Sequence, residues 1–206
     1  DIVFTSSLES ISGAAFSSSA IRSVTFADEG NPYVASAAFR WMGELESFHI
    51  GSEMSDFHDD LDYNPKLATI TVGEGNTHYK AVENVLYSRY SSTWYVIRIA
   101  QNRAETSFTL PDDAFLTSYC GFGALTLKTL ILSDNENRVP DYRFSHCESL
   151  TSITFGNHEN FEIGYSFYNC TALEEIIIPS NVKSIAQCAF EECGALRTVI
   201  FENGYD

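Results

Sequence analysis

The sequence predicts an α/β solenoid: a right-handed superhelix with short parallel strands on one face, little helix, and one β-hairpin insertion. Three observations predict it. Apolar residues recur every 23 positions in the C-terminal third, each copy ends in the same apolar pattern, and the period breaks in one place. A repeat of this length is typical of proteins that stack one small unit on the next.

The repeat is visible as columns of residues 23 positions apart. The first column contains Phe144, Phe167 and Phe190. Four further columns keep the same step: Cys147, Cys170 and Cys193; Leu150, Leu173 and Leu196; Ile153, Ile176 and Val199; and Phe155, Ile178 and Phe201. The alternation at the end of each copy, as in residues 153–155, is the pattern of a short strand with one buried face.

The final apolar-x-x-apolar-x-apolar portion also recurs upstream. The four upstream copies are Ile21/Val24/Phe26, Leu45/Phe48/Ile50, Leu67/Ile70/Val72 and Leu127/Leu130/Leu132. With the three C-terminal copies these make seven, and residues 2–4 resemble the end of an eighth. The period and the L-x-x-L-x-L core match the leucine-rich repeat. We therefore expect a single domain of about eight coils over residues 1–206, with the phenylalanines of one column lying over one another.

The period breaks between Val72 and Leu132, which are 60 residues apart and leave 37 residues beyond one repeat. Two β-rich runs, residues 81–87 and 94–99, flank the polar segment 88–93. This pattern predicts a β-hairpin within residues 73–109, either projecting from the solenoid or forming one remodelled coil. Its aromatic residues either pack the hairpin onto neighbouring coils, which we favour, or recognise a ligand: Tyr87, Tyr90, Trp94 and Tyr95.

These residues resemble the BspA-like leucine-rich-repeat surface proteins of bacteria. Residues 178–196 read I-P-S-N-V-K-S-I-A-Q-C-A-F-E-E-C-G-A-L, close to the pattern I-P-x-x-V-x-x-I-x-x-x-A-F-x-x-C-x-x-L of that family. The run from Tyr79 to Tyr87, followed by Leu110-Pro111, is similar to a family element, although Asn84 stands where the family has glycine. The resemblance is weakest over residues 54–65.

The resemblance implies a location and a role. Members of the family are secreted or surface-anchored proteins implicated in adhesion, so it implies a protein or glycan ligand on a host or neighbouring microbial surface. The resemblance implies no particular ligand. Residues 1–4 lack the features of a signal peptide, and composition alone leaves the compartment open.

The overall charge disfavours a nucleic-acid partner, and the hydropathy argues against a transmembrane segment. The chain carries 28 acidic residues against 12 Lys and Arg, a net charge of −16. Binding to nucleic acid depends on cations that neutralise phosphates, so we do not expect a nucleic-acid partner. The sequence contains no apolar run of 18 residues, so we expect no transmembrane segment in this chain.

We expect no cofactor and no metal. The cysteines in the 23-residue column should be buried free thiols, because parallel side chains in one register fit a disulfide poorly, and no C-x-x-C pair is present. The five histidines lack metal-binding spacing and are expected in loops or on the surface. The densest acidic group lacks the EF-hand spacing, and we favour a solvated loop over calcium binding there: Asp56, Asp59, Asp60 and Asp62.

No nucleophile motif such as G-x-S-x-G occurs, and we expect the protein not to be an enzyme. The expected function is a non-enzymatic binding module of a cell-surface or secreted bacterial protein. One alternative is a structural spacer that holds another domain, and the least favoured is a carbohydrate-active enzyme, since any two carboxylates can meet in a fold.

The expected binding surface is the exposed face of the strands. If each copy of the apolar-x-x-apolar-x-apolar portion buries its first, fourth and sixth residues, the fifth residue, between the last two, points outward. This places one row on the surface: Thr25, His49, Thr71, Ile131, Thr154, Ile177 and Ile200. Three isoleucines are unusual on a face that meets only water, so this end of the row either binds a protein or pairs with a following domain or a second copy.

Overall fold

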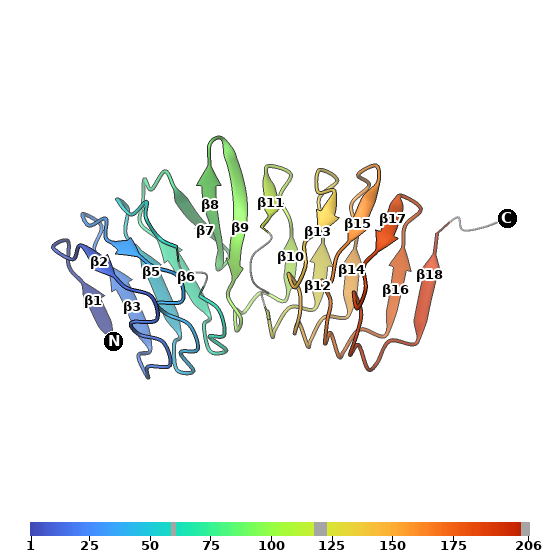
Figure 1. Cartoon of the computed structure of the whole chain (residues 1–206), viewed down its shortest axis with the longest axis horizontal. Coiled ribbons are helices and arrows are strands. Elements are labelled where there is room, and N and C mark those ends of the chain that lie inside the picture. Colours follow the sequence, from blue (N-terminus) through green and yellow to red (C-terminus); the bar gives the residue numbers. More distant parts are fainter. Residues whose placement is uncertain (59–60, 118–122, 203–206) are drawn as a thin grey trace. The chain divides into compact units, whose positions relative to one another are not determined.

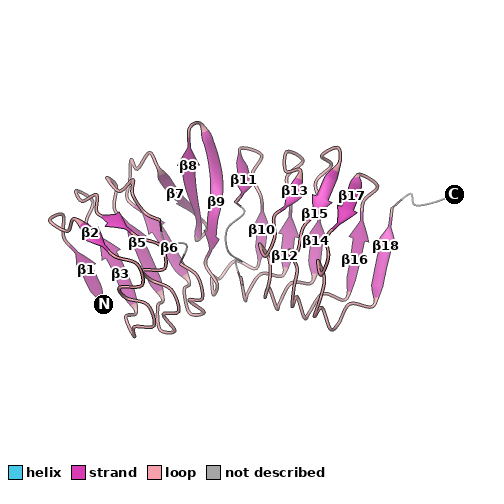
Figure 2. Ribbon diagram, in the orientation of Figure 1, coloured by secondary structure: helices cyan, strands magenta, loops and turns pink. Residues whose placement is uncertain are grey.

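The computed structural model describes residues 1–58, 61–117 and 123–202. The chain forms two compact units, Asp1–Arg103 and Ala104–Asp206, which we call unit 1 and unit 2 and describe separately. The described residues form strands, turns and loops and no helix (Figure 2). The expectation of an α/β class with little helix was therefore not confirmed, and the described parts of the solenoid are β structure. The prediction of a single domain over residues 1–206 remains a prediction.

Each unit stacks the repeat strands in parallel (Figure 1). These strands are β1 Ile2–Phe4, β3 Ser23–Phe26, β5 Ser47–Ile50 and β6 Thr69–Val72 in unit 1, and β10 Ser107–Thr109, β12 Thr129–Ile131, β14 Ser152–Thr154, β16 Glu175–Ile178 and β18 Thr198–Phe201 in unit 2. In unit 1, Val24 pairs with Phe48 and Phe48 pairs with Ile70, so equivalent repeat positions are neighbours. The repeat register read from the sequence is confirmed.

Strand β10 is a repeat strand that the sequence pattern placed inside the insertion. Its Phe108 pairs with Leu130 of β12 and is buried. The pattern is hidden because Glu105 occupies the first apolar position of this copy.

A second set of short strands lies on the other side of the coils, whereas the sequence predicted strands on one face only. These strands are β2 Ser10–Ile11 and β4 Tyr33–Val34 in unit 1, and β11 Ala114–Leu116, β13 Arg138–Val139, β15 Phe161–Ile163 and β17 Val182–Ile185 in unit 2. Strands β2 and β4 pair in parallel, and so do β13, β15 and β17. Each strand is held by the coil beside it, which explains how a two-residue strand persists.

The core of unit 2 contains the predicted phenylalanine column. The rings of Phe144 and Phe167 stack with centroids 5.7 Å apart, and those of Phe167 and Phe190 stack at 5.4 Å, with interplanar angles of 9° and 3°. Phe144 and Phe167 are fully buried. The central structural prediction is therefore confirmed: side chains 23 positions apart form a shared interior.

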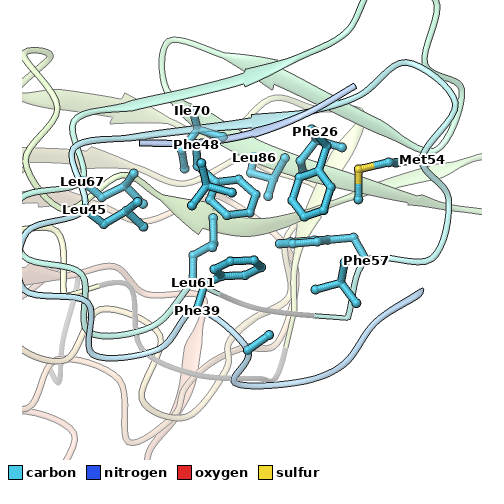
Figure 3. Packing of buried hydrophobic residues seen from close by; sticks show 14 of the residues in the cluster. Phe26, Phe39, Leu45, Phe48, Met54, Phe57, Leu61, Leu67, Ile70 and Leu86 are labelled. Atoms are coloured by element: carbon cyan, nitrogen blue, oxygen red, sulfur yellow. The ribbon is translucent and has the colours of Figure 1, made fainter. Parts of the chain in front are cut away.

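The core of unit 1 follows the same plan. Phe16 and Phe39 stack at 5.5 Å with an angle of 6°, as their 23-residue spacing predicts. Phe39 also meets the ring of Phe48 edge to face at 5.1 Å. Leu45 and Leu67 pack beside these rings from successive coils (Figure 3).

The predicted insertion forms three antiparallel strands rather than two. They are β7 Tyr79–Val82, β8 Val85–Tyr90 and β9 Thr93–Ile99, paired in that order. The expected strand over 81–87 is split by a tight turn at Glu83 and Asn84, whose φ angles are +49° and +60°. A turn with two positive φ angles is the usual link of a two-residue hairpin, and asparagine adopts this conformation more readily than most residues.

The antiparallel strands are joined to the coils of unit 1 by packing and hydrogen bonds. Leu86 belongs to the hydrophobic core of this unit. The Tyr79 hydroxyl accepts a hydrogen bond from the Phe57 N–H at 3.1 Å and lies 3.1 Å from the Ser55 carbonyl oxygen. Burial raises the pKa of the Tyr79 hydroxyl. These contacts tie β7 and β8 to the preceding coil.

A buried ion pair makes a further connection. Arg98 of β9 is fully buried and pairs with Asp62, whose carboxylate also accepts a hydrogen bond from Arg40 at 3.0 Å. The prediction of a solvated acidic loop is thus wrong for Asp62, because two guanidinium groups compensate the cost of burying its charge. Asp56 is exposed beside His58 as expected, whereas Asp59 and Asp60 lie outside the described residues.

The predicted cysteine column is present as free thiols. Cys147, Cys170 and Cys193 are buried. The Cys170 thiol donates to the Phe144 carbonyl at 3.3 Å, and the Cys193 thiol donates to the Phe167 carbonyl at 3.1 Å. Burial raises the pKa of the Cys147 thiol to about 12. Cys188 is half-buried and free, and Cys120 lies outside the described residues.

Candidate recognition surface

The structure places the predicted outward row on the strand face of each unit. In unit 1, Thr25 pairs with His49 and His49 pairs with Thr71; in unit 2, Ile131 pairs with Thr154 and Ile177 pairs with Ile200. Two members were missed from the sequence because their copies are incomplete: Val3, beside Thr25, and Thr109, beside Ile131.

The unit 1 part of the row borders an open hollow on the strand face. Its volume is about 390 Å³, and its lining consists of Val24, Thr25, Ser47, Phe48, His49 and Thr71. Three of these residues belong to the predicted row. The buried undersides of β3 and β5 fix the positions of these side chains, because Val24 and Phe48 are anchored in the core.

His49 is held in one orientation at this hollow. Its Nδ1 lies 2.8 Å from the Thr71 hydroxyl, and its Nε2 lies 3.8 Å from a carboxylate oxygen of Asp28. The same Asp28 oxygen accepts a hydrogen bond from the Ser52 N–H at 3.0 Å. Sequence reasoning missed Asp28, which follows the end of β3 and reaches the next coil.

A hydroxyl, an imidazole and a carboxylate in a row invite comparison with a catalytic triad. The separation of 3.8 Å between His49 and Asp28 is longer than a hydrogen bond. The hollow lies open on a strand surface, whereas nucleophilic chemistry favours an enclosed site that excludes water. The geometry supports hydrogen bonding to a ligand and gives no support to nucleophilic catalysis.

The unit 2 part of the row is apolar and exposed. The exposed fractions are 37% for Ile131, 43% for Ile177 and 42% for Ile200. Glu175 lies on β16 two residues before Ile177, on the same exposed face, and it pairs in register with Thr198. Val199 and Phe201 occupy core positions and are also about half exposed, because among the described strands β18 pairs with β16 alone. An apolar patch with a polar border is typical of a contact surface.

The four hairpin aromatics do not form one surface. Tyr87 is buried, as the packing interpretation expected, and Tyr90 is 78% exposed near the β8–β9 turn. Trp94 and Tyr95 are half-buried. The Lys80 ammonium lies 5.1 Å from the centre of the Tyr87 ring and 4.4 Å from that of Trp94, so a cation covers part of this aromatic face. A role in recognition remains a prediction for these residues.

No cluster of three or more histidine, cysteine or acidic side chains within residues 1–58, 61–117 and 123–202 has the geometry to hold a metal ion. Over the same residues, no helix could cross a membrane.

The stacked coils and their register define a leucine-rich-repeat protein. The profile of the BspA-type leucine-rich-repeat region matches residues 1–88 and 101–206 in six copies, so the chain belongs to this family. The unmatched residues, 89–100, cover the end of β8 and all of β9, where the repeat is replaced by the hairpin. No curated protein sequence matches the chain.

Two solved structures resemble the chain over 98% of its length. One is the pneumococcal vaccine antigen PcpA, with 24% identity and a TM-score of 0.83. The other is a leucine-rich cell surface protein from Faecalibacterium prausnitzii, with 21% identity and a TM-score of 0.73. The chain spans 50% of the first protein's length and 60% of the second's. At these identities the likeness establishes the fold.

Proposed function

We propose that this chain is a non-catalytic recognition module of a bacterial surface or secreted protein, which binds a protein ligand through its strand face. The observation that carries the proposal is the outward isoleucine row of unit 2, in which Ile177 and Ile200 pair in register and are each more than 40% exposed. Burying such side chains against a partner contributes about 25 cal/mol per Å² of apolar area. Family membership and the description of one structural relative as a cell surface protein support the location.

The hollow of unit 1 extends the proposal to polar contacts. Thr25, His49 and Thr71 offer hydroxyl and imidazole groups whose positions are set by the strands beneath them. Fixed polar groups of this kind supply the direct hydrogen bonds of a protein interface. A glycan is a second ligand class that these polar groups suit, whereas the isoleucines favour protein.

The test replaces Ile177 and Ile200 together by lysine and measures binding to an array of host extracellular matrix proteins and glycans. We expect the wild-type chain to retain one or more matrix proteins, and the double variant to lose them while its circular dichroism is unchanged. The matched control replaces Ser184, an exposed residue of β17 on the other side of the coil, by lysine and should bind normally. Unchanged binding by the double variant would reject the strand face, and an array without any binder would favour a structural spacer.

A further inference from the structure

A pair of exposed aromatic residues lies on the turns of unit 1, away from the strand face. Trp41 and Tyr63 are 54% and 55% exposed, and their ring centroids are 5.7 Å apart with an interplanar angle of 27°. They occupy the same position in consecutive coils, because the Trp41 N–H donates to the carbonyl of Asp62, directly before Tyr63. Large aromatic rings normally bury most of their surface, so two such rings on adjacent turns need an explanation.

The backbone at this position disfavours large side chains. Trp41 and Tyr63 have φ angles of +57° and +56°. The same position in other coils has the same conformation with smaller or polar residues: Ser18, His146, Asn169 and Glu192. A bulky residue with positive φ is rare because its Cβ crowds the backbone. The conformation belongs to the repeat, and only the aromatic side chains distinguish these two coils from the coils with smaller or polar residues at this position.

The rings rest on a fixed cationic support. The Arg40 guanidinium carbon lies 5.4 Å from the centre of the Trp41 ring and 5.9 Å from that of Tyr63. Arg40 is oriented by its 3.0 Å hydrogen bond to Asp62, which is itself held by the buried Arg98. The site is therefore ordered before any ligand arrives, which lowers the entropic cost of binding.

A polar pair stands on the same two turns, three residues after each ring. The Lys66 ammonium donates to both carboxylate oxygens of Glu44 at 2.8 Å. On the other side of Trp41, the preceding coil presents the small Ser18, whose N–H donates to the Arg40 carbonyl. A small neighbour covers little of the Trp41 ring, in keeping with its exposure. The site thus combines an uncovered aromatic surface with fixed hydrogen-bond donors and acceptors.

We propose that Trp41 and Tyr63 form a carbohydrate-binding site that stacks on the apolar face of a neutral sugar ring. The C–H groups of a pyranose face carry slight positive charge and suit the negative face of an aromatic ring. The hydroxyl groups at its edge both donate and accept, which suits the Glu44 carboxylate and the Lys66 ammonium on the same two turns. The site lies apart from the strand face, so this proposal does not depend on the protein-binding proposal above.

The chain provides its own spectroscopic probe. It contains two tryptophans, so the Trp94→Phe variant leaves Trp41 as the single tryptophan. In this variant, titration with cellotetraose, chitotetraose and mannotetraose should produce a saturable change in Trp41 fluorescence for at least one sugar, with a Kd on the order of 1 mM.

A second substitution tests the pair. Tyr63→Asn, which introduces the residue that holds the same backbone conformation at position 169, should weaken binding about tenfold, the scale of one aromatic contact. The control Tyr142→Ala removes a tyrosine of similar exposure, 54%, at a positive φ in unit 2 and should leave the affinity unchanged. Lysine at positions 177 and 200 should also leave sugar binding intact, so the two proposals can fail separately.

Three results would overturn the assignment. The first is the absence of a saturable response to all three sugars. The second is a response to a proline- and tyrosine-rich peptide without one to any sugar, which would assign the rings to a protein partner. The third is unchanged sugar affinity in the Tyr63→Asn variant when its circular dichroism matches that of the wild-type chain.

Discussion

Arg98 on β9 and Asp62 on a turn form an ion pair that is buried inside unit 1, although 36 residues separate them in sequence. The pair connects the antiparallel strands to the coils. It also orients Arg40 beneath Trp41 and Tyr63. The buried Asp62 carboxylate therefore has two structural roles: it attaches the hairpin to the coils, and it orders the turns that carry Trp41 and Tyr63.

Breaking this pair should strongly destabilise unit 1. Arg98→Met leaves the buried Asp62 without its main partner, and we expect a loss of about 3–5 kcal/mol in the free energy of unfolding, measured by urea denaturation. The double variant Arg98→Met/Asp62→Leu should recover most of this loss, because it buries no charge. An equal loss in both variants would contradict the electrostatic explanation.

The phenylalanine column predicts a large cavity effect. Phe167 is fully buried between the rings of Phe144 and Phe190, so Phe167→Ala should lower the free energy of unfolding by about 3–5 kcal/mol. Half-buried Tyr168 is the neighbouring control, and Tyr168→Ala should cost clearly less than Phe167→Ala, because part of its ring already lies in water. A nearly neutral Phe167→Ala would mean that the stacked column contributes little to stability.

Glu136 predicts a pH dependence. Its carboxylate is buried and accepts a 2.8 Å hydrogen bond from the Leu116 N–H, and burial outweighs this bond and raises the pKa of the carboxyl. Because the pKa of Glu136 is higher in the folded than in the unfolded chain, protonated Glu136 contributes to the free energy of unfolding. This contribution is fully present below the unfolded pKa of about 4.5, and it is lost as the pH rises through the folded-state pKa.

Glu136→Gln keeps an acceptor for Leu116 and removes the ionisation. The variant should therefore gain stability relative to wild type as the pH increases above about 4.5. Urea denaturation at pH 4, 5, 6 and 7 measures the difference. A constant difference over this range would show that the carboxyl titrates alike in folded and unfolded chains.

Two of the three column thiols should be inert in the folded protein. The thiolate is the reactive form; burial raises the pKa of Cys147 to about 12, and the hydrogen bond with Cys193 raises the pKa of Cys170, whereas the same bond lowers the pKa of Cys193. Replacing Cys120 and Cys188 by serine leaves the three column thiols. We expect at most one thiol of this variant, Cys193, to react with a disulfide reagent at pH 8 in the native state, and all three to react after denaturant is added; a second fast-reacting thiol in the native state would contradict the burial of Cys147 and Cys170.

The repeat could be predicted because its signal is periodic. Phe144, Phe167 and Phe190 define a register in which each outward residue follows from its buried neighbours. The second set of strands escaped prediction because a strand such as β2 contains two residues, too few to show alternation. Its hydrogen bonds come from the adjacent coil, which local sequence does not reveal.

The antiparallel segment and the aromatic turns depend on long-range contacts. The turn between β7 and β8 requires positive φ angles at Glu83 and Asn84. The family pattern has glycine at the position of Asn84, and a glycine there could have indicated the turn from the sequence. The burial of Asp62 depends on Arg98, which no spacing rule links to it. Trp41 and Tyr63 are 22 residues apart, near the repeat period, and this spacing could have identified the pair.

The register between β16 and β18, in which paired residues are 23 positions apart, has a consequence for engineering. Each residue of β16 pairs with the residue 23 positions later in β18. Deletion of 23 consecutive residues would therefore keep buried positions in the buried columns and outward positions in the outward columns. An excision one residue longer or shorter would exchange the inward and outward columns and place isoleucine side chains from the interior in water. The number of coils can therefore be altered in steps of one, and the outward row of side chains would shorten or extend by the same step.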